Sequence, residues 1–370
     1  MPSTLSPVPG EPVTCVDVGC YQIPTDGPEA DGTLEWDATT LVVVHAHGGG
    51  QVGFGYSYAH RAAAAVILDT YIPLVVGADA LSPQATWSAM RRAARNLGQP
   101  GVAACALSAV DVALWDLKAK ILDQPLLDLL GAARDSVPAY GSGGFLTYGE
   151  DQLTAQLSGW AEQGLPAVKM KIGARPETDI SRVWAARDAI GADVDLFVDA
   201  NGACTVSQAL ELAAAFRDAG VIWFEEPVSS DAIDELAAIR RHAPPGIDVT
   251  AGEYGWSLLD FRRLLEADAI DVLQPDATRC GGVTGFMQAD VLCEAFDLPL
   301  SAHTAPSLHA TLCCAAGRAR HTEYFHDHVR IETMLMDCAR TAENGQLAPD
   351  RSRAGLGLEL KESDAERYAI

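Results

Sequence analysis

The chain has 370 residues, of which 48% are hydrophobic, 7% aromatic and 21% charged. This composition is typical of a globular protein with a sizeable core, and it excludes intrinsic disorder. The formal net charge of −24 repels nucleic acid and anionic lipid headgroups at long range, so we expect neither as a partner.

We expect no targeting signal at the N-terminus. The first arginine is Arg61 and the first lysine is Lys118, so the basic region of a signal peptide and the arginines of a transit helix are both missing. The apolar stretch Val102–Leu117 contains two aspartates and is shorter than the roughly 18 to 20 residues that span a bilayer. We therefore expect a cytoplasmic protein with no membrane partner.

The N-terminal third predicts a small antiparallel sheet followed by helices. Runs that are typical of strands lie at Val13–Tyr21, Thr39–His47 and Gln51–Tyr56. Residues 23–33 are rich in Pro, Gly and Asp, which predicts a loop, and we expect residues 21–33 to act as a mobile lid. Helical periodicity follows in Ala59–Ile72, Gln84–Leu97, Val102–Leu117 and Leu126–Leu130. We expect this α+β unit to close near Arg134, shortly after the helix-ending Gly131.

Short apolar runs then alternate with longer amphipathic stretches. After an expected first strand at Tyr140–Phe145, the runs are Ala167–Lys171, Leu196–Asp199, Ile222–Glu225, Val249–Glu253, Ile270–Asp276, Leu300–His303 and Thr322–Phe325. Their spacing of about 25 residues is the length of one strand, one crossover helix and two loops. The pattern predicts a parallel α/β barrel.

Nearly every run ends in a residue able to do chemistry, namely Lys171, Asp199, Glu225, Glu253, Asp276, His303 and Glu323. The C-terminal ends of barrel strands meet at one face, where the active sites of such barrels lie. We therefore expect these side chains to line one cavity.

Three of these residues are carboxylates that end consecutive strands: Asp199, Glu225 and Glu253. Hard oxygen ligands that leave positions open for water and substrate suit Mg²⁺ or Mn²⁺ better than Zn²⁺. We interpret this trio as a metal site.

The other strand ends predict acid/base groups. Lys169 and Lys171 lie two apart and point to the same side of one strand, and their mutual repulsion beside a metal is expected to lower their pKa values, as a general base requires. Asp276 and His303 end adjacent strands, so the carboxylate can fix the imidazole tautomer. Glu323, if protonated, can donate a hydrogen bond to an enolate oxygen.

The motifs resemble the enolase superfamily, mandelate racemase subgroup, over essentially the whole chain. They are, in order, Lys169-Met170-Lys171, Val198-Asp199-Ala200-Asn201, Phe224-Glu225-Glu226-Pro227, Gly252-Glu253, Gln274-Pro275-Asp276, Gly281-Gly282-Val283-Thr284-Gly285 and Ser301-Ala302-His303. The resemblance implies a modified TIM barrel, (β/α)7β, over residues 136–344. It also implies an α+β capping domain over residues 1–135, completed by residues 345–370.

The resemblance further implies the chemistry. The shared first step is abstraction of the proton α to a carboxylate, giving an enediolate stabilised by Mg²⁺. By motif position, Lys171 and the His303–Asp276 dyad become acid/bases on opposite faces of the substrate, and Lys169 helps to polarise its carboxylate. We expect a small-molecule carboxylate substrate and a homo-oligomer, from dimer to octamer. The residues expected to contact substrate are Tyr21, Tyr56, Asn201 and His326.

Within this subgroup we favour the dehydration of an acid sugar to a 2-keto-3-deoxy acid, with a racemase or epimerase and a lactone cycloisomerase as alternatives. Tyr254 and Arg279 depart from the subgroup's usual residues, which bears on the substrate. A metal-dependent amidohydrolase or a non-catalytic binding barrel are readings from other classes. The His45-Ala46-His47 motif resembles an amidohydrolase metal pair, but the later strands end in Glu253 and Asp276 instead of histidines.

A last group is formed by His321, His326, Asp327 and His328, which bracket Glu323. Its composition resembles that of a metal site, yet substrate contact or loop packing is the favoured interpretation.

Overall fold

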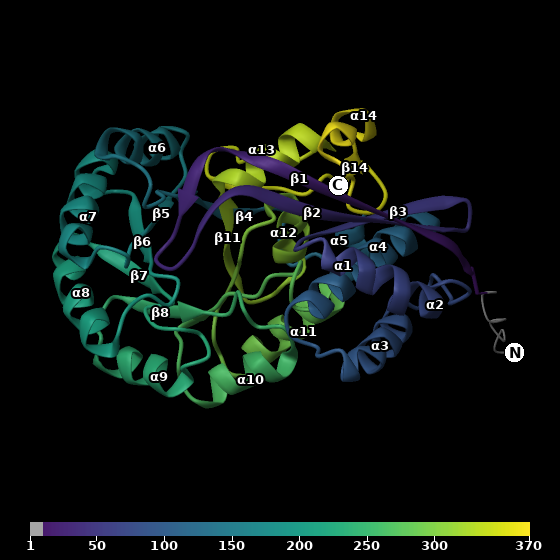
Figure 1. Cartoon of the computed structure of the whole chain (residues 1–370), viewed down its shortest axis with the longest axis horizontal. Coiled ribbons are helices and arrows are strands. Elements are labelled where there is room, and N and C mark those ends of the chain that lie inside the picture. The colour runs from purple at the N-terminus through teal and green to yellow at the C-terminus, as the bar shows by residue number, and fades with distance from the viewer. Residues whose placement is uncertain (1–9) are drawn as a thin grey trace, which may run out of the picture.

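The computed structural model describes residues 10–370 of the chain. It consists of a three-stranded antiparallel sheet with its helices and a closed parallel barrel beside it (Figure 1). The predicted fold class, a modified TIM barrel with an α+β cap, is confirmed.

The cap sheet has the order β1-β2-β3, with β1 at Val13–Ala30, β2 at Glu35–Gly48 and β3 at Gln51–Tyr58. The predicted loop over residues 23–33 is wrong, because β1 continues to Ala30 and pairs with β2 on both sides of a register shift between Pro24 and Glu29. Ile23 and Glu29 of this segment are buried, so it packs as the strand of a hairpin. Its Pro and Gly residues form a bulge within the hairpin.

The cap helices follow: α1 (Ala62–Val66), the π-helix η1 (Ile67–Tyr71), α2 (Ile72–Val75), α3 (Pro83–Ala93), the 3₁₀ turn η2 (Ala94–Asn96), α4 (Val102–Ile121) and α5 (Leu126–Leu130). The largest of them, α4, is almost wholly buried and lies against β3. This close approach depends on glycine, because a Cβ at Gly53 or Gly55 would stand 2.2–2.3 Å from a carbonyl oxygen of α4.

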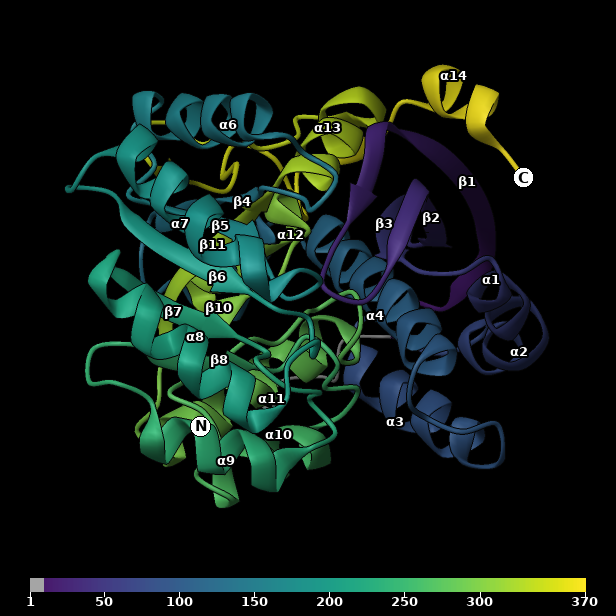
Figure 2. The same ribbon diagram turned by 60° about the vertical axis from the view of Figure 1, so that its left-hand side comes forward.

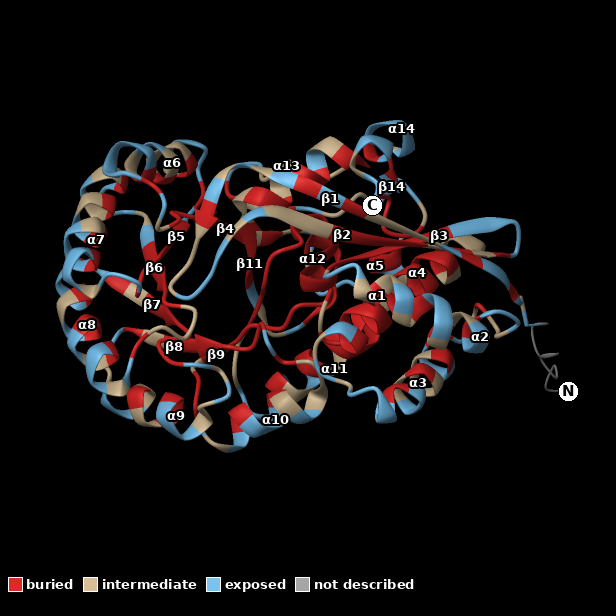
Figure 3. Cartoon of the chain, in the orientation of Figure 1, coloured by how far each residue is buried: buried red, intermediate tan, exposed pale blue. Residues whose placement is uncertain are grey.

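The barrel strands are β4 (Val137–Gly143), β5 (Ala167–Lys171), β6 (Asp195–Asp199), β7 (Val221–Glu225), β8 (Asp248–Ala251), β9 (Val272–Leu273), β10 (Leu300–Ala302) and β11 (Ala319–Phe325). They pair in parallel in chain order, and β11 pairs with β4 to close the barrel. The intervening helices are α6 (Glu150–Glu162), α7 (Pro176–Ile190), α8 (Val206–Asp218), α9 (Ile233–His242), α10 (Leu258–Glu266), α11 (Gly282–Ala295) and α12 (Pro306–Ala315). Figure 3 shows buried strands inside and helices with exposed outer faces around them.

The two ends of the barrel interior differ. Toward the N-terminal ends of the strands, the interior is filled by a cluster of Tyr140, Ala167, Phe197, Trp223 and Val272. The Lys169 ammonium lies next to this cluster, 5.6 Å from the centre of the Tyr140 ring. Polar groups therefore gather at the other end, where the strands terminate.

The C-terminal part of the chain returns to both halves of the molecule. After α13 (His326–Leu335) come β12 (Met336–Asp337), β13 (Gln346–Leu347), β14 (Glu359–Leu360), α14 (Glu362–Ala365) and the 3₁₀ turn η3 (Glu366–Tyr368). The short strand β13 pairs with β4 of the barrel, whereas the Ile370 amide donates to Cys20 O of β1 at 3.0 Å. The division into residues 1–135 plus 345–370 and residues 136–344 stays a prediction.

The hairpin of β1 and β2 reaches from the cap across to the barrel (Figures 1 and 2). Its turn contacts the segments that follow two barrel strands, since a Cβ at Gly32 would lie 2.2 Å from Ala200 O and 2.9 Å from Ile172 O. The Leu146 amide, beyond β4, donates to Ala30 O at 2.9 Å. The cap thus covers the C-terminal ends of the strands. Within residues 10–370, no helix is long and apolar enough to cross a membrane.

Candidate active site

Three carboxylates stand side by side at the mouth of the barrel. Asp199 and Glu225 are register partners at the ends of β6 and β7, and Glu253 follows β8 after Gly252. All three are buried, and one oxygen of each lies within 4.8 Å of the others. Glu225 Oε1 is buried without a hydrogen-bond partner, so the trio has an unused ligand atom and suits a divalent cation.

Two buried lysines on β5 neutralise part of this charge. Lys169 Nζ lies 2.6 Å from Glu225 Oε2 and 2.8 Å from Glu323 Oε1, and Lys171 Nζ lies 2.6 Å from Asp199 Oδ2. Among the protein's own groups, burial lowers the pKa of each ammonium, but the neighbouring carboxylates outweigh burial and raise it. The expectation of lysine pKa values lowered beside a bound metal stays a prediction.

Glu323 on β11 accepts three hydrogen bonds. Its Oε1 accepts from Ser142 Oγ at 2.5 Å and from Lys169, and its Oε2 accepts from the Thr304 amide at 2.8 Å. Burial opposes ionisation, but Lys169 and His303 outweigh it and lower the pKa of Glu323 to about 2. In this arrangement the side chain acts as an acceptor, from Lys169 and the Thr304 amide. A protonated Glu323 that donates to an enolate oxygen stays a prediction.

The two members of the predicted dyad are in contact. His303 Nδ1 lies 2.9 Å from Asp276 Oδ2, and the Thr278 amide donates to Asp276 Oδ1 at 2.7 Å. Burial disfavours the imidazolium, but Glu253 and Asp276 outweigh burial and raise the pKa of His303 to about 9. Since a carboxylate only accepts, His303 Nδ1 carries a proton and Nε2 faces Glu253 Oε2 at 3.0 Å.

These contacts give the site a simple order. Lys171 contacts Asp199 at one end of the row of carboxylates, and His303 contacts Glu253 at the other end. A substrate carboxylate bound over the row would have one candidate acid/base on each side. The arrangement can therefore remove a proton from one side of a carbon and supply one from the other.

Sequence reasoning missed several neighbours of these groups. Trp223 donates its indole N–H to Glu225 Oε2 at 3.1 Å, and Glu226 is a further buried carboxylate, whose pKa is raised by burial and by the charge of Glu253. Arg279 lies 3.5 Å from both Glu253 Oε1 and Asp276 Oδ2 and stacks on the Tyr254 ring. Tyr254 and Arg279 were noted in the sequence as departures from the subgroup's usual residues, but their contacts with Glu253 and Asp276 were not anticipated.

Of the four expected substrate contacts, the structure brings only Asn201 to this cluster. Its backbone N–H donates to Asp199 Oδ1 at 2.9 Å, and its side-chain oxygen is buried without a hydrogen-bond partner. Tyr21 pairs with Ala369 of the C-terminal segment, and the Tyr56 hydroxyl is buried and donates to Glu332 Oε1. His326 contacts Asp26 of the hairpin at 2.9 Å.

The three histidines of the predicted group lie in different surroundings, His326 against the hairpin and the other two elsewhere. His321 lies inside the barrel, bonded to Ser301 and packed among the aromatic rings of Tyr140 and Phe197. His328 stacks on the ring of Tyr58, at 3.4 Å between centroids. These side chains therefore do not form one ligand set.

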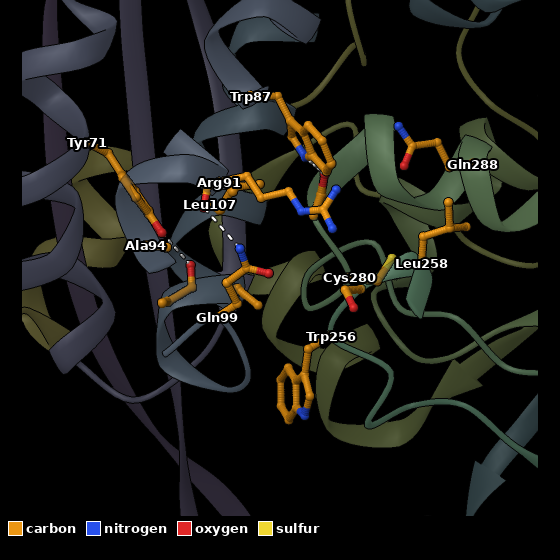
Figure 4. A pocket seen from close by; sticks show the side chains of 14 residues that line it. Tyr71, Trp87, Arg91, Ala94, Gln99, Leu107, Trp256, Leu258, Cys280 and Gln288 are labelled. Carbon is orange, nitrogen blue, oxygen red and sulfur yellow. Dashed lines mark hydrogen bonds between the residues drawn. The ribbon is translucent and has the colours of Figure 1, made fainter. Parts of the chain in front are cut away.

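A separate hollow lies between the cap helices and the β8–α10 connection (Figure 4). It is lined by residues such as Trp87, Arg91, Gln99 and Trp256. Trp87 donates to Gly281 O at 2.9 Å, so the hollow adjoins the segment after Asp276. None of the strand-end residues lines it.

Comparison with protein families gives two matches that together span most of the chain. Residues 28–131 match the mandelate racemase / muconate lactonizing enzyme N-terminal domain, and residues 152–364 match the enolase C-terminal domain-like family.

Characterised relatives match over most of their own length. D-galactarolactone cycloisomerase of Agrobacterium fabrum is 34% identical over 275 residues, which cover 73% of this chain and 72% of the relative. Arabinonate dehydratase of Saccharolobus solfataricus is 30% identical over 332 residues, covering 86% of this chain and 87% of the relative. The two relatives thus differ in the reaction that their names state.

Solved structures agree over almost the whole chain. A mandelate racemase/muconate lactonizing enzyme-like protein from Rubrobacter xylanophilus is 49% identical, with a TM-score of 0.95 and coverage of 97% of this chain and 100% of the other. A racemase from Streptomyces coelicolor, solved with bound magnesium, is 29% identical, with a TM-score of 0.91 and the same coverage.

Proposed function

This chain belongs to the mandelate racemase and muconate lactonizing enzyme family of the enolase superfamily, and we propose that it removes the proton α to the carboxylate of an acid sugar. The reaction that we favour is dehydration to a 2-keto-3-deoxy acid. The observation that carries the proposal is the row of three buried carboxylates with Lys171 at one end and the His303–Asp276 dyad at the other.

We assign Asp199, Glu225 and Glu253 as ligands of Mg²⁺, with Mn²⁺ as a cation that fits the same oxygens. The assignment is supported by the unpartnered Glu225 Oε1 and by the magnesium bound in the related racemase. Bound there, the ion would supply positive charge that stabilises the substrate carboxylate as it gains electron density.

The chain's own residues divide the remaining work. Lys169, held by Glu225 and Glu323, keeps a positive charge beside the substrate carboxylate. In its neutral form, Lys171 takes the α-proton. His303, oriented by Asp276, then gives a proton to the β-hydroxyl, which leaves as water, and the enol that remains tautomerises to the 2-keto acid. Asn201 is the remaining candidate substrate contact, through its free carbonyl oxygen.

A lactone cycloisomerase is the second candidate, because the relative from Agrobacterium fabrum carries that activity in its name. A racemase or epimerase would use the same two acid/bases. Release of a 2-keto acid identifies the dehydratase, ring rearrangement without loss of water identifies the cycloisomerase, and scrambled α-stereochemistry alone identifies the racemase.

The test is a screen of acid sugars and their lactones in D₂O with Mg²⁺, in which deuterium at the α-carbon and product are both measured. We expect α-exchange with at least one acid sugar, and none after Glu225→Gln. This substitution removes one of the three carboxylate charges but keeps a side-chain oxygen that can accept the hydrogen bond from Trp223. Full turnover after exhaustive chelation would contradict the metal assignment. A cytoplasmic location and homo-oligomeric assembly stay predictions.

A further inference from the structure

We propose that Asp26, Glu29 and His326 form a second divalent-cation site, separate from the barrel mouth, that joins the cap hairpin to the barrel. One candidate ligand atom from each residue lies within 4.8 Å of the other two. Asp26 and Glu29 belong to β1, and His326 is the first residue of α13, directly after the barrel strand β11. A cation here would connect two segments that are about 300 positions apart in the sequence.

The observation that points to a ligand is the state of Glu29. Its side chain is fully buried, and its Oε1 has no hydrogen-bond partner among the described residues, whereas Oε2 accepts from Trp36 Nε1 at 2.8 Å. A buried carboxylate oxygen without a partner is costly unless a proton or a cation satisfies it. Asp26 and His326, 2.9 Å apart, lie beside that carboxylate with nitrogen and oxygen donors.

The charges around Glu29 do not balance. Asp26, Glu29 and Asp327 contribute three carboxylates, while Arg330 is the one permanent cation in the group and is already paired with Asp327 Oδ1 at 2.5 Å. A divalent cation would offset this excess of negative charge.

The backbone holds the three side chains in place. Between Pro24 and Glu29, β1 advances five positions while β2 moves back two, from Ala38 to Trp36, so β1 contains three extra residues. This bulge is fixed on both sides, because Arg330 Nη2 donates to Pro24 O at 2.7 Å and Thr147 Oγ1 donates to Pro28 O at 2.6 Å. The bulge therefore presents Asp26 to His326.

The donor set indicates which cation would bind. One imidazole nitrogen and two carboxylates suit Zn²⁺, Co²⁺ or Mn²⁺, whereas Mg²⁺ prefers oxygen ligands alone. The site would thus differ in metal preference from the carboxylate trio at the barrel mouth. Because His326 lies three residues after Glu323, a bound cation would hold the hairpin closed over the catalytic residues.

The chain offers a matched control for this proposal. His47 and Asp17 form an equivalent pair at 2.8 Å, with Cys15 as a third candidate ligand, on the first two cap strands. In that group both side chains of the pair are accessible and no buried carboxylate is left unpartnered. We therefore propose no site there. Because exposed side chains of this kind can also bind Zn²⁺, His47→Gln is the variant that separates such binding from the proposed site.

The experiment is a calorimetric titration of Zn²⁺ into the full-length protein in the presence of excess Mg²⁺, the cation that we assign to the carboxylate trio. We expect His326→Gln and Glu29→Gln each to weaken the binding of one Zn²⁺ per chain at least about tenfold, while His47→Gln retains that site. Zn²⁺ should also raise the melting temperature of His47→Gln more than that of His326→Gln. The titration needs no substrate, so it is independent of the proposed enzymatic reaction.

Two results would overturn the proposal. The first is Zn²⁺ binding that is unchanged in both His326→Gln and Glu29→Gln. The second is Zn²⁺ binding that disappears in His47→Gln alone. Should either substitution reduce folding, Asp26→Asn provides the same test at a partly exposed position, where the loss of one carboxylate charge should likewise weaken binding.

Discussion

Replacing Asp276 by asparagine should disable the dyad while the shape of the side chain is kept. The two carboxylate oxygens accept different hydrogen bonds, one from the Thr278 amide at 2.7 Å and one from His303 Nδ1 at 2.9 Å. An asparagine has one oxygen and one NH₂ group for these two donors. Because the Thr278 N–H cannot change its role, the amide oxygen must face it, and the NH₂ group must then face His303.

This orientation disfavours the imidazolium form of the histidine. Nδ1 must accept from the NH₂ group and therefore loses its proton, which leaves a neutral ring whose one proton is on Nε2, the nitrogen that faces Glu253. The charged form, which donates the proton in the proposed dehydration, is lost. Turning the amide around instead leaves two buried N–H groups facing each other, at a cost of about 1–3 kcal/mol, and removes a charged hydrogen bond of about 1.5–3 kcal/mol. The combined loss of roughly 2.5–6 kcal/mol corresponds to at least about 10²-fold in the rate of any step that needs His303.

The assay is turnover of whichever acid sugar the D₂O screen identifies, measured for Asp276→Asn together with α-proton exchange. We expect turnover to fall at least about 10²-fold, with exchange through Lys171 retained and the melting temperature changed by only a few degrees. Asp271→Asn is a control, because Asp271 also accepts two bonds, from Arg240 and Val249, but at the other end of the barrel. Turnover within threefold of wild type in Asp276→Asn would refute the assigned role of the dyad.

Three further outcomes follow from the same structure. Lys171→Ala and His303→Asn should each lower turnover at least about 10²-fold, and one of the two should still exchange the α-proton in D₂O; wild-type rates in both would contradict their roles. Gly32→Ala should raise KM and lower the melting temperature only slightly, because the new Cβ would displace the hairpin turn from Ala200 O. An unchanged KM would show that the hairpin does not shape the site. Glu332 accepts from Tyr56, Tyr58 and Ser307 in a buried position, and burial raises its pKa from 4.5 to about 7. Its folded pKa lies above the unfolded value, so its stabilising effect is complete below about pH 4.5 and is lost as the pH rises to about 7, by at most about 3 kcal/mol. Glu332→Gln should therefore flatten the fall in unfolding free energy between pH 5 and 8 in denaturant titrations, and an unchanged pH dependence would count against this assignment.

The sequence alone was sufficient to predict the barrel and the position of its polar residues. Regular spacing of short apolar runs is a local signal, and the polar residue that ends each run marks the face where the strands terminate. The pairing of His303 with Asp276 could be anticipated for the same reason, since adjacent strands bring their ends together. Such predictions require only strand order.

The cap was harder to predict, because its contacts join residues far apart in the chain. Pro24, Gly27 and Pro28 are typical of a loop, yet the hairpin accommodates them in a bulge fixed by Arg330 and Thr147. Tyr56 was expected to contact substrate, but Glu332, 276 positions later, binds its hydroxyl. The direction of the lysine pKa shifts also needed the structure, because it depends on how closely each ammonium approaches its carboxylates.

The alignment of Lys171, Asp199 and Glu225 as register partners on β5, β6 and β7 has a consequence for how this protein tolerates insertions and deletions. The backbone ladder sets the spacing of these side chains, so residues gained or lost in the outer helices and their loops leave it unchanged. One residue gained or lost within a strand would instead turn the functional side chain to the opposite face of the sheet. Insertions and deletions among descendants of this sequence should therefore be found between the strands and be eliminated by selection within them.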